Sequence, residues 1–180
     1  HSTSDIIVTE DSGETLANKG FDKVFDGDTN TLVETFLVFH SIIYNTNHTY
    51  NGNTSPTNNY YGVWVQQQYN SPIYFTKFKL YPRIDLLSSA PKELKVFVGN
   101  DGINWTELYY FFKDDWDSND VEVTKTFTSP VANTPYTFIR FVFNSTWGNT
   151  LQGQYMVIQE LEIFGNKEIS SSGTTIDSNT

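Results

Sequence analysis

Oxygen-bearing residues gather near the start of the chain, between Asn18 and Thr35. This segment of 18 residues contains three Asp, two Asn and two Gly. A hard cation such as calcium takes about six to eight oxygen ligands from carboxylates, hydroxyls and carbonyls. Gly27 allows a turn tight enough to point carbonyls inward. The segment predicts a cation-binding loop; the alternative is an ordinary turn rich in Asp and Asn.

Two tryptophans lie in polar loops. Trp147 falls within Asn144–Gln154, a loop rich in Asn and Gly. An exposed loop aromatic is typical of a binding surface, so Trp147 is a candidate ligand contact. Trp116 lies in the acidic loop Asp114–Asp120. Its ring is either a second contact or an anchor for a loop that would otherwise be solvated.

The residues that would support catalysis are missing or unpaired in the sequence. There is no Cys, the three His are scattered, and no GxSxG segment occurs. These absences argue against thiolate or zinc chemistry and against a serine triad. Asp and Glu are plentiful, but nothing pairs two of them across a cleft as a glycosidase requires. We expect a non-enzymatic chain.

The chain is strongly acidic, with 21 Asp and Glu against 11 Lys and Arg. A net charge of −10 would repel nucleic acid and anionic membrane surfaces. No apolar run approaches the ~18 residues of a membrane span. Neither nucleic acid nor membrane is therefore an expected partner.

The elements that must position these residues are strands. Leu94, Val96 and Val98 alternate with other residues, which is the pattern of a strand with one face toward a core. The range 136–143 alternates likewise, and turn residues punctuate the chain about every dozen positions. We expect separate strands beginning at Trp64 and over 73–81, divided by a turn at 70–72. The fold class predicted is all-β.

Five segments, in order, resemble the coagulation factor 5/8 type C (discoidin-like) domains, most closely the family 32 carbohydrate-binding modules. The resemblance implies a jelly-roll sandwich of about eight antiparallel strands over 1–166, followed by a flexible polar tail over 167–180. The segments are FDKVFDGDTNT, LYPRID, VFVGNDGINW, YTFIRFVF and IQELEIFG.

The resemblance also implies one structural calcium between the early loop and the last strand. By position, the ligands would be the backbone oxygens of Lys23, Asp28, Thr31 and Gln159 and the side chains of Asp26, Thr31 and Glu160.

Sugar-binding members of this family use loops at one end of the sandwich. By position, the corresponding ligand residues are Glu34, Arg83, Asp85, Ser89 and Tyr155. A guanidinium and carboxylates can hydrogen-bond sugar hydroxyls, and an aromatic face packs on the apolar side of a pyranose. Arg83 could instead simply pair with Asp85, and Tyr155 could serve only packing.

The expected sugar site departs from the family pattern at three positions. Glu34 replaces a common His, Val33 a common Trp, and Ser89 the usual Asn. An insertion over 36–59 could reshape the same rim. Its polar part, 45–59, holds too few apolar residues to predict packing. Four residues of this insertion are possible new contacts: His40, Tyr44, His48 and Tyr50.

Together these features predict a non-catalytic carbohydrate-binding module with a structural calcium, attaching a secreted or cell-surface protein to glycans. The small polar residues of 170–180 resemble a linker, so we expect a larger multidomain parent. The alternative is a protein-binding adhesion or structural domain without sugar affinity, favoured by the three departures.

Overall fold

The computed structural model describes residues 6–10, 24–25, 27, 37–39, 44–148 and 155–167. In this part of the chain the helical segments are two 3₁₀ turns, and none is long and apolar enough to cross a bilayer. The remaining elements are strands, which confirms the all-β prediction. The elements are β1 (Ile6–Glu10), β2 (Leu37–Phe39), β3 (Val63–Pro82), η2 (Ile84–Ser89), β4 (Pro91–Gly99), β5 (Thr106–Phe112), β6 (Val123–Thr126), η3 (Val131–Asn133), β7 (Pro135–Thr146) and β8 (Met156–Lys167).

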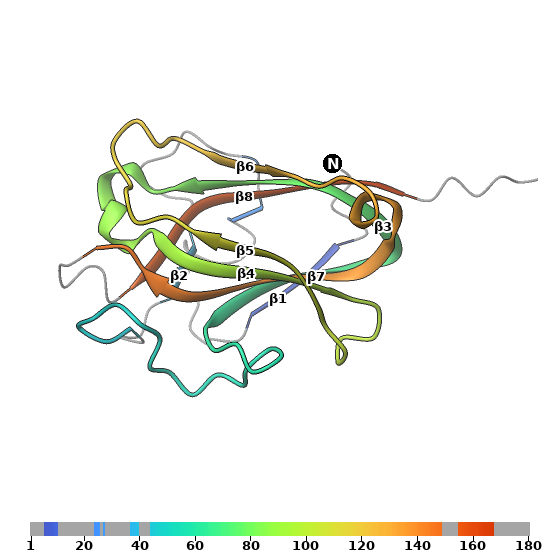
Figure 1. Ribbon diagram of the computed structural model, residues 1–180, viewed down its shortest axis with the longest axis horizontal. Helices are drawn as coiled ribbons and strands as arrows, with labels where there is room; N and C mark the ends of the chain where they lie inside the picture. The colour runs from blue at the N-terminus through green and yellow to red at the C-terminus, as the bar shows by residue number, and fades with distance from the viewer. Residues whose placement is uncertain are drawn as a thin grey trace, which may run out of the picture.

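The strands form one curled antiparallel sheet whose two parts face each other, as expected for the sandwich (Figure 1). The first half of β3 pairs with β1 and β7, and β7 continues through β4 to β5. The second half of β3 pairs with β6 and β8, and β8 pairs with β2. β3 therefore belongs to both layers. Of the tail expected over 167–180, only Lys167 lies within the described residues.

The expected break at Asn70-Ser71-Pro72 is wrong: β3 is one strand of 20 residues. Its pairing with β7 shifts register between Gln68 and Ile73, and the three residues of the expected turn are exposed. Pro72 lacks a backbone N–H, which is tolerated where a ladder is interrupted. The turn signal therefore marks the bend at which β3 passes from one layer to the other.

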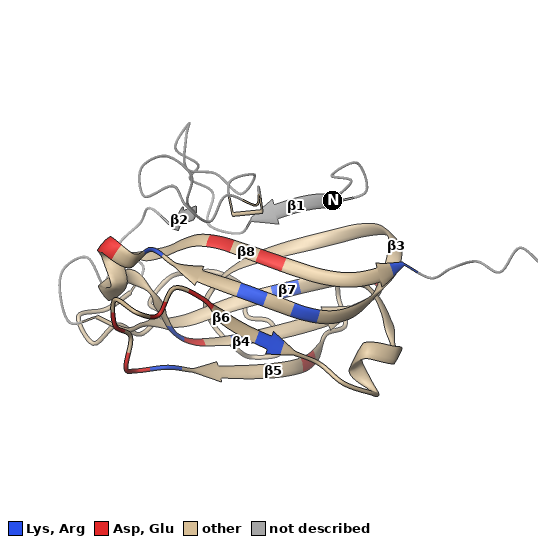
Figure 2. Ribbon diagram, turned by 90° about the horizontal axis from the view of Figure 1, so that it is seen from above, with Lys and Arg blue, Asp and Glu red and all other residues tan. Residues whose placement is uncertain are grey.

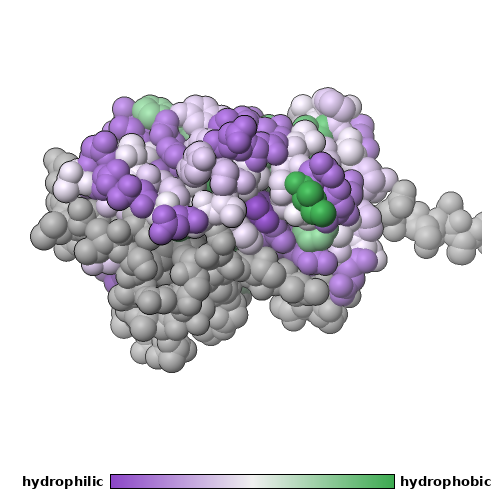
Figure 3. All heavy atoms as spheres, turned by 90° about the horizontal axis from the view of Figure 1, so that it is seen from below, coloured by the Kyte–Doolittle hydropathy of each residue, from purple (hydrophilic) through white to green (hydrophobic). Residues whose placement is uncertain are grey.

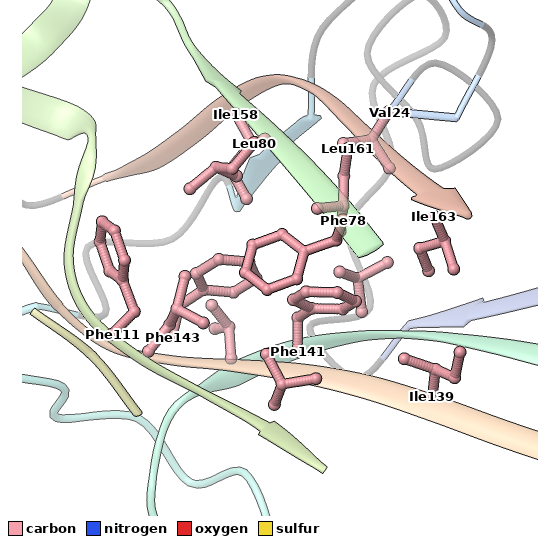
Figure 4. Close-up of a cluster of buried hydrophobic side chains, with 14 of the residues drawn as sticks. Val24, Phe78, Leu80, Phe111, Ile139, Phe141, Phe143, Ile158, Leu161 and Ile163 are labelled. Carbon is pink, nitrogen blue, oxygen red and sulfur yellow. The ribbon is translucent and has the colours of Figure 1, made fainter. Parts of the chain in front are cut away.

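The core lies between the layers and is rich in aromatic side chains (Figure 4). The alternating residues identified in the sequence, among them Val96 and Phe141, are fully buried. Phe78 from β3 packs edge-on against Phe141 from β7, with ring centroids 5.2 Å apart. Edge-to-face packing at this spacing is favourable for aromatic pairs.

The insertion packs on the outer face of the layer that contains β7, β4 and β5, contrary to the expectation for a loop so poor in apolar residues. Phe97 and Val142 point outward by strand alternation, yet they are 0% and 1% exposed. Tyr60, the residue that follows the insertion, lies over Phe97 with ring centroids 6.2 Å apart. Asn58 donates its side-chain amide to the carbonyl oxygen of Trp105 at 2.7 Å. A few aromatic contacts and hydrogen bonds thus dock a polar segment onto a sheet.

Charged residues are spread along the strands and loops, with no broad basic area on the described chain (Figure 2). Hydrophilic side chains cover most of the described surface in Figure 3, which holds only small hydrophobic spots. Acidic and basic groups often pair locally, as Lys95 does with Glu107 at 2.7 Å. This surface agrees with the acidic composition.

Candidate functional site

Arg83 and Asp85 form a bidentate ion pair at one end of the sandwich. Nε of Arg83 lies 2.7 Å from Oδ1 of Asp85, and Nη2 lies 2.9 Å from Oδ2. Arg83 follows Pro82 at the end of β3, and Asp85 lies in the first turn of η2. The side chains are 15% and 47% exposed. The pair fixes the plane of the guanidinium and leaves the Asp85 carboxylate open to solvent.

Ser89, the third predicted ligand residue of this loop, is buried at 1% exposure. Its neighbour Ser88 contacts the end of β7, because the backbone N–H of Gly148 donates to the carbonyl of Ser88 at 2.9 Å. A Cβ added to Gly148 would lie 2.1 Å from the Cβ of Ser88. Glycine is therefore required for this approach. The loop after β3 is tied firmly to the loop after β7.

Trp147 lies at this junction and is half-buried against the core. Its indole Nε1–H donates to the carbonyl oxygen of Asp114 at 2.7 Å. Its backbone N–H donates to the carbonyl of Ala90 at 2.9 Å. The ring is therefore held in one orientation, which suits a contact surface for a ligand.

Tyr155 is half-buried immediately before β8. Ile158 of β8 pairs with Pro82, which precedes Arg83 in the chain. Tyr155 thus belongs to the same end of the sandwich as the ion pair. Glu34 lies outside the described residues. The structure gathers the other five predicted ligand residues at one end, four of them at least partly exposed.

The insertion contributes anchors as well as surface. Tyr44 is 1% exposed and donates its hydroxyl to the carbonyl oxygen of Phe143 at 2.9 Å. Tyr50 packs edge-on against Tyr44 and accepts a hydrogen bond from the backbone N–H of Thr54 at 2.9 Å. These two tyrosines hold the insertion in place, and Tyr44 is buried too deeply to contact a ligand. His40 lies outside the described residues.

Trp116 is also an anchor. It is 3% exposed, and its indole N–H donates to the carbonyl oxygen of Pro91 at 2.9 Å. Of the two alternatives for this ring, loop anchoring is confirmed. Lys113 bridges Asp115 at 2.7 Å and Asp120 at 3.2 Å in the same loop, and its ammonium lowers the pKa of the Asp115 carboxyl.

The early loop contacts the last strand where the calcium site is expected. Glu160 is 1% exposed, and its Oε1 accepts a hydrogen bond from the backbone N–H of Gly27 at 3.2 Å. The backbone N–H of Leu161 donates to the carbonyl of Val24 at 2.7 Å. The register between β3 and β8 shifts at this point, with Gln159 as the extra residue on β8.

Four of the six expected calcium ligands belong to the early loop. Lys23, Asp26, Asp28 and Thr31 lie outside the described residues. Among the residues that are described, no three His, Asp or Glu side chains gather as a metal-binding group. Among the described residues, the fit to a calcium ion therefore depends on Glu160. Its buried carboxylate faces the early loop, and a positive charge there would offset the cost of removing it from water.

Sequence reasoning missed a pocket of about 300 Å³ at the same end of the sandwich. His48 and Trp147 were candidates, but the strand residues Lys92, Glu93 and Phe112 were not. The sequence gives little indication of these residues, because they lie at strand ends, where the alternation of apolar and polar residues stops. An aromatic at the end of an edge strand, as with Phe112, is the one feature that could have indicated a surface role.

Comparisons with known proteins agree with this architecture. The family model described as F5/8 type C domain matches residues 8–160. The search of curated proteins found no match.

Three solved structures illustrate the similarity, and the first and third of them come from Clostridium perfringens. CpGH89CBM32-5, in complex with GalNAc-β-1,3-galactose, is 18% identical with a TM-score of 0.59, covering 88% of this chain and 94% of that chain. CBM32-2 of GH31, bound to GalNAc, is 14% identical with a TM-score of 0.61, covering 88% and 96%. CBM32-3 from a family 31 glycoside hydrolase is 17% identical with a TM-score of 0.62, covering 91% and 93%. At these identities the likeness shows the fold.

Proposed function

Because this chain belongs to the F5/8 type C domain family, we propose that it is a carbohydrate-binding module that attaches a secreted or cell-surface parent protein to glycans. The F5/8 type C domain is a non-catalytic kind of domain, in agreement with the expectation that this chain is no enzyme. Two of the structural neighbours are complexes with sugars that contain GalNAc. Neighbouring modules also come from larger glycoside hydrolases, which supports a multidomain parent.

The observation that carries this proposal is the bidentate pair of Arg83 and Asp85 at the loop rim. A guanidinium held in one plane donates hydrogen bonds to sugar hydroxyls without first losing rotamer entropy. The half-exposed Asp85 carboxylate has lone pairs left to accept hydroxyl hydrogens. Tyr155, on the same end, supplies an aromatic face for the C–H side of a pyranose. The ligand would be a galactose-type or other surface sugar.

Such recognition is shallow, because the groups lie on loops at the surface. One site of this kind gives weak affinity, and repeated modules or repeated glycans raise it through effective concentration. This arrangement suits a module whose task is to hold a larger protein near glycans.

We propose in addition that calcium joins the early loop to β8. Buried Glu160 would supply a carboxylate, and Gln159 a backbone carbonyl at the register shift, where a bulge redirects backbone groups. The other ligands would be Lys23, Asp26, Asp28 and Thr31 of the early loop. Calcium would supply positive charge that offsets the desolvation of the buried carboxylate. Its role would be structural, holding the rim in position.

A glycan array probed with the full chain in calcium, beside the Arg83→Ala variant, tests the sugar site. We expect binding to glycans with terminal galactose or GalNAc, and loss of that binding in Arg83→Ala. Lys125→Ala, which removes a cation from β6, is the matched control and should bind as the native chain does. A folded native chain that binds no glycan on a broad array would refute the proposal and favour a protein-binding adhesion domain.

A further inference from the structure

The pocket of about 300 Å³ lies beside the loop rim, on the outer side of β4 and β5. The insertion, the start of β4, the end of β5 and the end of β7 meet here, at the left end of the molecule in Figure 1. Its volume of about 300 Å³ is at the lower limit of small-molecule sites. Arg83, Asp85 and Tyr155 do not line it. The lining residues used below are His48, Lys92, Glu93, Phe112, Ser145 and Trp147.

The walls of the pocket carry two aromatic rings. Phe112 lies at the end of β5 and is 50% exposed, which is unusual for a phenylalanine on a sheet. Trp147 is half-buried and fixed by its hydrogen bond to Asp114 at 2.7 Å. A ring held in place presents its face to a ligand at low entropic cost. Rings of this kind pack against the C–H groups of a pyranose.

Glu93, which also lines the pocket, provides oriented acceptors. Its Oε1 accepts a hydrogen bond from the Tyr110 hydroxyl at 2.5 Å, and its Oε2 accepts one from Oγ of Ser145 at 3.1 Å. A carboxylate has about four lone-pair sites, so both oxygens can accept further hydrogen bonds from a ligand. The hydrogen bond to Glu93 is also the main cause that raises the pKa of Tyr110 to about 12. Tyr110 therefore remains a donor near neutral pH, and Glu93 keeps its orientation.

Lys92 provides a donor on the same wall. Within the part of the chain that the structure describes, no carboxylate lies within ion-pair distance of its ammonium. The ammonium lies over the ring of Phe112, whose centroid is 5.4 Å from Nζ. The charges of Lys92 and Glu93 balance each other. Lys113 nearby is occupied by Asp115 and Asp120. The pocket is therefore close to neutral and combines donors, acceptors and ring faces.

We propose that this pocket, here called the Lys92 pocket, is a second carbohydrate subsite that takes one neutral hexopyranose. Glu93 accepts hydroxyl hydrogens, Lys92 donates to ring or hydroxyl oxygens, and Phe112 and Trp147 pack on the C–H side of the sugar. The balanced charge favours a neutral sugar over an acidic one. The inference goes beyond the rim proposal, because it holds whether or not the rim around Arg83 binds sugar.

A titration of the ¹⁵N-labelled full chain with methyl β-galactoside, methyl α-mannoside, GalNAc and GlcNAc tests this subsite. We expect saturable shifts at the amides of His48, Lys92 and Phe112 with at least one of these sugars. Phe112→Ala and Lys92→Ala should each weaken that binding about tenfold. Both side chains are partly or largely exposed, so the variants should fold, and unchanged spectra away from the pocket verify it.

Two further variants separate this subsite from the rim. Arg83→Ala should leave the shifts at Lys92 and Phe112 unchanged. Ile103→Ala, which removes an exposed apolar residue from the β4–β5 turn, is the matched control and should change nothing. The inference is overturned if none of the four sugars shifts the pocket amides, or if Arg83→Ala removes the shifts while Phe112→Ala does not. In that second case the rim proposal stands alone.

Discussion

The guanidinium carbon of Arg140 lies 3.7 Å from the ring centroid of Trp64. A second indole, Trp105, covers it from another direction at 4.1 Å. The guanidinium nitrogens also donate to Gln66 at 2.7 and 3.0 Å and to Thr57 at 2.9 Å. An arginine on the outer face of a sheet is thereby enclosed by two strands, a hairpin and the insertion.

Arg140→Ala should therefore destabilise the fold by about 2–4 kcal/mol, from the loss of two cation–π contacts and of hydrogen bonds to a charged donor. Arg140→Lys should recover only part of the loss, because an ammonium lacks the planar fork. Urea unfolding, followed by tryptophan fluorescence, measures the free energy of unfolding of the native chain and of each variant. Lys125→Ala, at the edge strand β6, also removes a cation from two rings, at 4.6 and 5.9 Å from their centroids, but it breaks no hydrogen bonds like those of Arg140 and should change stability less. Equal effects of both variants would contradict this account.

Tyr44→Phe should cost about 1–2 kcal/mol, because the buried carbonyl of Phe143 loses its side-chain donor. Since Tyr44 holds the insertion, we also expect faster hydrogen exchange at the neighbouring amides of Asn45 and Tyr50. Tyr61→Phe is the control, because that side chain is 53% exposed. Unaltered exchange at the insertion in Tyr44→Phe would show that other contacts hold it.

Asp85→Asn should weaken glycan binding at the rim about tenfold, because the Arg83 guanidinium loses its charged partner and its fixed plane. Asp114→Asn alters a carboxylate in a neighbouring loop and serves as the control. Isothermal titration with the best glycan from the array provides the measurement. If Asp85→Asn binds as tightly as the native chain, the ion pair does not orient the ligand contact.

We expect calcium to raise the melting temperature of the native chain, and Glu160→Gln to abolish that rise. The carboxamide keeps the shape of the side chain but not its charge, so it offers calcium a weaker ligand. Thermal unfolding in calcium and in EGTA, for both chains, measures the difference. A native melting temperature that is the same in both buffers would refute the calcium proposal and leave the sugar-site proposal unaffected.

Asp101 should titrate with a pKa near 2, about two units below an ordinary aspartate. The hydrogen bond from the Asn104 side chain is the main cause, and the backbone N–H groups of Ile103 and Asn104 add to it. Because folding lowers the pKa of Asp101, the ionised carboxylate contributes to the stability of the fold. This stabilisation is complete above about pH 4 and is lost as the pH falls through about 2. An NMR titration of the Asp101 carboxyl measures it. A midpoint near 4 would show that the turn does not hold the carboxylate.

The strands of the core were predictable from sequence because alternation is a direct result of strand geometry. Val96 and Phe141 follow this rule and are buried as expected. Phe97 broke the rule, since it occupies an outward position and yet is fully covered. What covers it is Tyr60 and its neighbours, and no local pattern indicates that a polar insertion will return to that strand. Burial on a second face is a property of tertiary packing.

The candidate site was predictable to a similar degree. Arg83 and Asp85 are two residues apart in a loop, so their pairing was foreseeable as one alternative. The buried position of Ser89 and the pocket beside Lys92 depend on how the loops after β3 and β7 meet, through Gly148 and Ser88. Contacts between loops distant in sequence leave no periodic signal, which is why those residues were misjudged or missed.

The membership of β3 in both layers has a consequence for synthesis of the chain. The second half of β3, with Phe75, Phe78 and Leu80, leaves the ribosome long before β8. Its register partners Glu160 and Leu161 follow Tyr81 and Leu80 by about 80 positions, a separation that makes pairing slow. During that interval an apolar strand stands without its neighbour and is open to aggregation or chaperone capture. The sandwich can close only when the last strand arrives.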